Sequence, residues 1–93
     1  MIISSKYFTN VAANGTVVVN PGAGRLHSIV INTKGASSNT CTVYDNVAGS
    51  GTKIATIDTT ANVVTLHYDI EFKVGLTVVL ATGTAADITV NWT

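Results

Sequence analysis

Three side chains that could bind a metal ion alternate along one short segment of the chain. His67, Asp69 and Glu71 occupy every second position of Leu66–Lys73. Imidazole and carboxylate groups bind divalent metals, and alternate residues of a strand share one face, so all three could reach one ion. Any solvated strand face shows the same alternation, and Lys73 continues the row with a charge that repels a cation. The pattern therefore predicts a solvated strand face and no metal site.

Asp58 offers a second kind of chemistry, because Ile57–Ala61 reads Ile-Asp-Thr-Thr-Ala. This order is similar to the Asp-Thr-Gly loop of retroviral-type aspartic proteases, in which two aspartates across a dimer axis share a proton and activate water. The tight turn of that loop needs glycine in the third position. Here the position holds Thr60, whose branched side chain favours extended structure. We expect a solvated aspartate at a strand end.

The remaining reactive residue types stand alone in the sequence. His27 has no second ligand at metal spacing, and we expect it to form a hydrogen bond near a turn or a subunit contact. Cys41 has no adjacent basic residue to lower its pKa, so it is predicted to be a small buried hydrophobe. Pro21–Arg25 contains glycines and one arginine but leads into a strand, which predicts a turn and no phosphate site. The sequence thus predicts no enzyme, no cofactor, and no catalytic, cofactor-binding or metal residues.

The low charge of the sequence limits the classes of partner that the protein is expected to bind. Five acidic and five basic side chains give a formal net charge of zero, with 11% of positions charged. The four lysines and six aromatic residues are dispersed, which is unlike a nucleic-acid surface, and no stretch is long and apolar enough to span a bilayer. We expect neither nucleic acid nor a membrane as partner. Carbohydrate stays open as a ligand, because an exposed Trp92 or Tyr44 could stack on a sugar, although a core position is expected for Trp92.

Composition points to strands throughout. Fifteen Thr, thirteen Val and eight Ile residues suit a pleated sheet, whereas the chain holds four Leu, one Met, one Glu and no Gln. A length of 93 residues fits one domain, 1–93. The absence of a signal-peptide pattern and the free cysteine predict a protein made in a reducing cytoplasm.

Alternation of apolar and polar residues then places the individual strands. The most regular segment is Leu66–Lys73, with apolar even positions, and Val63–Thr65 is expected to extend it backwards. The other predicted strands are Thr16–Asn20, Arg25–Thr33, Thr40–Tyr44, Lys53–Asp58, Leu76–Ala81 and Ile88–Trp92. Turn signals recur every eight to twelve residues. The fold class predicted is all-β: an antiparallel β-sandwich or jelly-roll-like barrel of seven to eight strands with essentially no helix.

A small β domain with so few charges has little protection against edge-to-edge pairing. Leu76–Ala81 is fairly apolar on both faces and needs cover on both sides. Burial in a symmetric assembly, or on a larger surface, would supply that cover. We expect a homo-oligomer, with a cyclic trimer favoured over a dimer.

Three stretches carry a resemblance to a known class of proteins. They are Asn20–Asn32, Thr42–Asn46 and the ending, in its segments Gly75–Gly83 and Asp87–Trp92, and they resemble small β-rich structural proteins encoded in the head and tail modules of tailed bacteriophages. The resemblance covers nearly the whole chain but consists of turn-and-strand patterns without a catalytic signature. It implies a virion structural protein, most simply a capsid decoration (cement) protein that oligomerises on the major capsid lattice.

The same resemblance leaves a second role open, namely a tail or fibre component, or a carbohydrate-binding β module for host attachment. In the first role the partners are the major capsid protein or other virion proteins, and Met1–Asn14 is a possible N-terminal arm that holds the protein on the particle. The implied location is the virion, and the host cytoplasm during assembly.

Overall fold

The computed structural model describes residues 7–93, and these residues form eight β-strands and no helix. The strands are β1 (Tyr7–Val11), β2 (Gly15–Asn20), β3 (Gly24–Thr33), β4 (Thr40–Asp45), β5 (Thr52–Asp58), β6 (Thr65–Phe72), β7 (Leu76–Ala81) and β8 (Asp87–Trp92). Seven of them match the predicted strands to within two residues at each end. The eighth, β1, falls inside the segment that was expected to be an arm.

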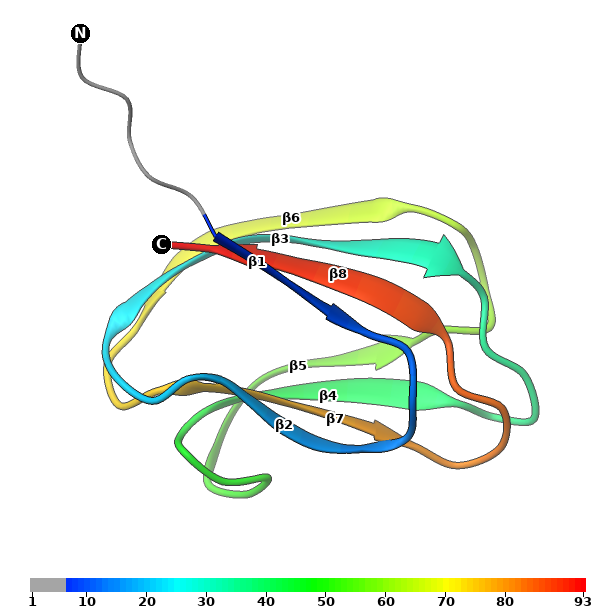
Figure 1. Ribbon diagram of the computed structural model, residues 1–93, viewed down its shortest axis with the longest axis horizontal. Coiled ribbons are helices and arrows are strands. Elements are labelled where there is room, and N and C mark those ends of the chain that lie inside the picture. The colour runs from blue at the N-terminus through cyan, green and yellow to red at the C-terminus, as the bar shows by residue number, and fades with distance from the viewer. Residues whose placement is uncertain (1–6) are drawn as a thin grey trace, which may run out of the picture.

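The strands form two four-stranded antiparallel sheets that face each other (Figure 1). Sheet A has the order β1-β8-β3-β6 and sheet B the order β2-β7-β4-β5. The first four strands pair antiparallel with the last four, β1 with β8, β2 with β7, β3 with β6 and β4 with β5. Pairing of β3 with β8 and of β4 with β7 rolls this long ribbon into two sheets. This is the jelly-roll topology, so the predicted fold class is confirmed.

Alternating apolar side chains from both sheets fill the space between them. Ile29 and Ile88 from sheet A are fully buried, as are Val43 and Val78 from sheet B. Every second residue of a strand points to the same face, so one row of Val, Ile and Leu per strand builds the core. Burying a side chain of this size stabilises the fold by about 1.5–3 kcal/mol. The core therefore follows directly from the alternation read in the sequence.

Strand β6 departs from its predicted alternation. Asp69 has φ = 52°, a left-handed conformation, and Tyr68 and Asp69 together lie opposite the single residue His27 of β3. This β-bulge adds one residue to β6 and bends the strand. Ile70, which follows the bulge and lies opposite the buried Leu26, is 37% exposed, although its even position predicted burial.

The predicted backward extension of this strand, Val63–Thr65, is confirmed at Thr65 and wrong at Val63 and Val64. Strand β6 begins at Thr65, and Val63 and Val64 are both exposed. Val64 keeps one connection to sheet A, because its carbonyl oxygen accepts a hydrogen bond from the Ile31 amide at 2.8 Å. Val63 and Val64 therefore belong to the β5–β6 loop, with this single backbone bond to β3.

The outer side of β7 is covered by the chain itself. Thr77 is fully buried beneath the β4–β5 loop, and its hydroxyl donates a hydrogen bond to the Asn46 carbonyl oxygen at 2.7 Å. Gly49 of the same loop lies so close to Val79 that a Cβ there would come within 2.9 Å of the valine methyl. The chain itself therefore covers Thr77 on the second face of β7, while Val79 and Ala81 on that face stay half-buried.

One buried asparagine, Asn39, connects the loops at the end of the sandwich where β8 begins. The side chain of Asn39 is fully buried; its Nδ2 donates to Asn14 Oδ1 and to the Thr82 carbonyl. Its Oδ1 accepts from the Thr59 hydroxyl and the Ala86 amide. A buried amide with all its partners in place fixes the loops that supply them. This Asn39 cluster ties the β1–β2 turn to the β5–β6 loop.

Candidate functional site

Asp58 lies in a closed local turn. Its Oδ1 accepts hydrogen bonds from the Thr60 hydroxyl at 2.6 Å and from the Thr60 amide at 2.9 Å. These two bonds, the hydroxyl first, hold the pKa of Asp58 below its ordinary value despite a small opposing effect of desolvation. The neighbouring Thr59 is buried in the Asn39 cluster. The predicted strand-end aspartate is confirmed, and the Asp-Thr-Thr segment serves as a turn.

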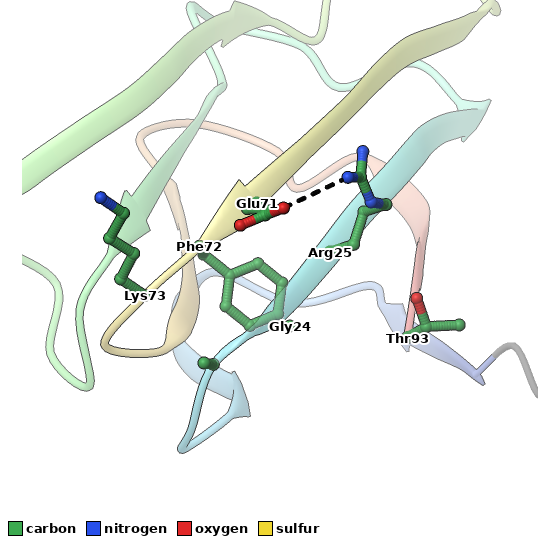
Figure 2. A pocket seen from close by; sticks show the side chains of 7 residues that line it. Gly24, Arg25, Glu71, Phe72, Lys73 and Thr93 are labelled. Carbon is green, nitrogen blue, oxygen red and sulfur yellow. Dashed lines mark hydrogen bonds and ion pairs between the residues drawn. The ribbon is translucent and has the colours of Figure 1, made fainter.

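Two of the three alternating residues of β6, Asp69 and Glu71, bind an arginine, whereas His67 does not. Arg25 Nη1 lies 3.2 Å from Asp69 Oδ1. Its Nη2 lies 3.4 Å from Glu71 Oε1, and Figure 2 shows this second pair. Arg25 lines a shallow groove of about 510 Å³ with Phe72 and Lys73. Across residues 7–93, no three His, Cys, Asp or Glu side chains gather closely enough to hold a metal ion. The groove presents an ion-paired arginine to solvent.

His27 lies at the bulge, where β3, β6 and β8 meet. Its Nε2 is 2.9 Å from the Thr93 hydroxyl oxygen, and its Nδ1 is 3.8 Å from Asp69 Oδ1. A cavity of about 620 Å³ beside it is lined by His27, Ser28, His67 and Asp69. The predicted hydrogen bond is present, and it joins β3 to the residue that follows β8.

Cys41 is fully buried in the core, as predicted. Burial raises the pKa of its thiol to about 12, so the thiol stays protonated at neutral pH. Tyr68 packs against the same core, and burial, followed by the nearby Cys41, raises the pKa of its hydroxyl. A cavity of about 310 Å³ opens beside Tyr68 between the sheets and is lined mainly by apolar side chains. Neither group is poised for nucleophilic chemistry.

The aromatic residue exposed most is Phe8, which the sequence had not singled out. Its side chain is 73% exposed on β1. Trp92 is half-buried, with its ring 4.9 Å from that of Tyr7 and its Nε1 3.4 Å from the Thr9 hydroxyl. Tyr44 is likewise half-buried. The two aromatics proposed for sugar binding are thus partly covered, and Phe8 takes their place as the open ring.

The lateral edge formed by β1 and β2 is uncharged. Each strand lies at the end of its sheet, and neither contains Asp, Glu, Lys or Arg. Besides Phe8, this edge exposes Tyr7 and Val18. Within the described residues, the outer side of each strand has no neighbouring strand, so backbone groups there are open to pairing. We call this surface the uncharged edge.

The segment expected to be an arm is, in its described part, mostly strand. Tyr7–Val11 pairs with β8 from Tyr7↔Trp92 to Val11↔Ile88, and Val11 reaches the core. Residues 1–6 lie outside the described residues. Removing 1–14 would therefore delete an edge strand of sheet A along with any arm.

No protein-family model matches this chain, and no curated protein matches it either. Nor does the part of the chain that the structure describes contain a helix long and apolar enough to cross a membrane. The geometry defines a jelly-roll module whose most distinctive surfaces are the uncharged edge and the outer face of sheet A.

Two groups of residues were missed by sequence reasoning, one on the outer face of sheet A and one buried among the loops. The alternation of Asp87, Thr89 and Asn91 signals an outward row on β8, but nothing in the sequence places Asn10 and Asn32 beside it. Nothing in the sequence indicates the Asn39 cluster, because an asparagine in a serine-rich connection is typical of any turn.

Proposed function

We propose that this protein is a bacteriophage virion structural protein, a capsid decoration subunit that oligomerises, as a trimer in the simplest case, and binds the major capsid lattice. The observation that carries the proposal is the uncharged edge of β1 and β2. Natural sheets protect solvent-facing edges with charges, prolines or bulges. An edge that keeps its apolar residues exposed and lacks charge is suited to being covered by a neighbouring subunit.

The fold and composition support the same role. Jelly-roll sandwiches recur in viral capsid proteins, which is an analogy of fold and no more. A net charge of zero leaves the short-range apolar and backbone contacts of the edge as the main source of affinity. The described residues contribute a buried apolar core built from both sheets.

Self-association is tested by light scattering on the purified protein with a charge placed on either edge. Val18→Lys adds a charge to the uncharged edge at a side chain that is 44% exposed, and Thr56→Lys adds the same charge to exposed β5. We expect the wild type and Thr56→Lys to share one oligomeric mass and Val18→Lys to be smaller. A wild type that stays monomeric at high concentration overturns the self-association.

The location is tested by cryo-electron microscopy of purified particles that contain the chain. Density on the capsid lattice supports a decoration protein. Density at the tail or at a fibre tip overturns decoration in favour of the second role, and absence of the chain from particles overturns the virion role altogether. An arm is tested separately with a truncated protein that lacks residues 1–6, since β1 begins at Tyr7. Equal occupancy of particles by the truncated and full-length proteins would exclude the arm.

A further inference from the structure

Three neighbouring strands of sheet A carry a connected cluster of polar side chains on their outer face. Asn10 Nδ2 on β1 donates to Asp87 Oδ1 on β8 at 2.7 Å, and Asn32 Nδ2 on β3 donates to the same oxygen at 3.1 Å. Asn32 also donates to the Thr89 hydroxyl at 2.9 Å. Strand β8 beneath the cluster is anchored by the fully buried Ile88 and Val90. These polar side chains are therefore held in fixed positions on a rigid support.

The cluster leaves its acceptors open. The amide nitrogens of Asn10 and Asn32 are used, since Asn10 also donates to the Ile88 carbonyl at 2.9 Å. Their Oδ1 atoms and Asp87 Oδ2 accept no hydrogen bond from the described residues. Each amide oxygen and carboxylate oxygen has two lone pairs. The face thus presents several oriented acceptors to a ligand rich in hydroxyl donors.

Phe8 adds an apolar platform beside these acceptors. It lies two residues before Asn10 on β1, so both side chains point to the outer face, about 7 Å apart along the strand. Phe8 stands opposite Asn91 of β8, whose amide donates to Ser28 at 3.0 Å. An exposed aromatic ring next to fixed amide and carboxylate oxygens matches a sugar ring, which has an apolar CH face and polar hydroxyl edges.

Charge narrows the class of ligand. Asp87 is the one charged side chain among the cluster residues, and hydrogen bonds from Asn10 and then Asn32 hold its pKa below the ordinary value. No lysine or arginine belongs to the cluster, so it offers nothing to neutralise a phosphate, sulfate or carboxylate group.

We propose that the outer face of sheet A binds a neutral oligosaccharide, stacked on Phe8 and hydrogen-bonded to the cluster of Asn10, Asn32, Asp87 and Thr89. Pairing through the uncharged edge would use the outer backbone groups of β1 and β2. It would leave the Phe8 ring free, because side chains stand perpendicular to the plane of the sheet and that of Phe8 points to the outer face of sheet A. The inference concerns a second surface and does not rest on the proposed place in a virion.

The test is glycan binding by the purified protein. An array of neutral and sialylated oligosaccharides is probed first, followed by titration calorimetry with maltotriose, cellotriose and triacetylchitotriose. We expect neutral oligosaccharides to bind and sialylated ones not to bind. Phe8→Ala and Asn32→Ala should each weaken binding about tenfold.

Matched variants separate the site from general effects. Val74→Ala removes another exposed apolar side chain, and Asn62→Ala another exposed asparagine, both outside the cluster. These two variants should bind like the wild type, and thermal melts of all four should confirm folding. The proposal is overturned if no neutral oligosaccharide binds at millimolar concentration or if sialylated ligands are preferred. It is also overturned if Phe8→Ala and Asn32→Ala bind no more weakly than the two control variants. Each of these outcomes leaves the light-scattering test of oligomerisation unaffected.

Discussion

The two lateral edges of this jelly roll are built differently. On one side, β1 and β2 contain no charged side chain, and Phe8 is largely exposed. On the other side, β5 carries Lys53 and Asp58, and β6 carries Asp69 and Glu71. The β6 edge also bulges at Asp69. Because β2 also has a register shift, between Val18 and Asn20, the two edges differ in charge and not in the presence of a bulge. Charge discourages edge-to-edge pairing, so the molecule protects the β5–β6 edge and leaves the other one able to associate.

Both edges nevertheless depend on one internal connection. Asn39 binds Asn14 in the β1–β2 turn and Thr59 in the β5–β6 loop. The difference between the edges is therefore one of surface chemistry, and it can be changed without disturbing the shared support. The variants below act on the support first and then on each edge.

Asn39→Ala should have the largest effect, because it removes the connection common to both edges. Loss of the amide leaves buried partners such as the Ala86 amide without a hydrogen bond. We expect a loss of about 3 kcal/mol in the free energy of unfolding, measured by urea denaturation, and a melting temperature lower by about 15 °C. Asn62→Ala, at an exposed position of the β5–β6 loop, is the control. A loss below about 1 kcal/mol would contradict a fastening role for Asn39.

Asp69→Val should have the next largest effect and acts on the protected edge alone. A β-branched side chain is strained at the left-handed φ of 52°, and we expect a loss of about 2 kcal/mol. Asp69→Gly tolerates that conformation and loses only an exposed ion pair with Arg25, so it should stay within about 1 kcal/mol of the wild type. Equal stability of the two variants would show that the bulge is not what constrains this position.

Asp45→Asn acts at the turn that follows β6. The Asp45 carboxylate accepts hydrogen bonds from the amides of Lys73, Val74 and Gly75. Burial by itself raises the pKa of Asp45, but these amide donors and the Lys73 charge outweigh it and lower the pKa below its ordinary 3.8. We expect a loss of about 1 kcal/mol at neutral pH, measured by urea denaturation.

The pH dependence of this variant follows from the direction of that shift. A carboxyl group whose pKa is lower in the folded state stabilises the fold fully above its ordinary value, and this contribution is lost as pH falls through the folded value. The wild type should therefore lose stability below about pH 4, and Asp45→Asn should lose less over the same range. Parallel stability curves for the two proteins in acid would count against this role of Asp45.

Val18→Lys should have the smallest effect on stability. Its side chain lies exposed on the uncharged edge, so the free energy of unfolding should change by less than about 0.5 kcal/mol. Its effect should instead appear as a lower oligomeric mass by light scattering. If Thr56→Lys on the protected edge lowers the mass equally, the difference between the edges has no bearing on assembly.

Sequence reasoning placed the strands well where alternation was strong. Leu76–Ala81 matches β7 at both ends, and the turn after it is present, with Thr82 and Gly83 both at positive φ. It placed β6 to within two residues at each end but missed its bulge, because a bulge is produced by pairing with β3 and leaves no mark in the local pattern. It also missed β1, because these five residues form a strand by pairing with β8, which lies more than seventy residues away in the chain.

The sequence by itself determined an all-β domain, a core of alternating Val, Ile and Leu, an inert Cys41, and too few charges to protect every edge. These properties depend on residue type and on a period of two along each strand, both of which are local. Only the tertiary structure decided which edges carry the charges, that Phe8 remains open while Trp92 is partly covered, and that Asn10, Asn32 and Asp87 meet on one face. Contacts between side chains of different strands depend on the order of the strands within each sheet, which no local sequence pattern encodes.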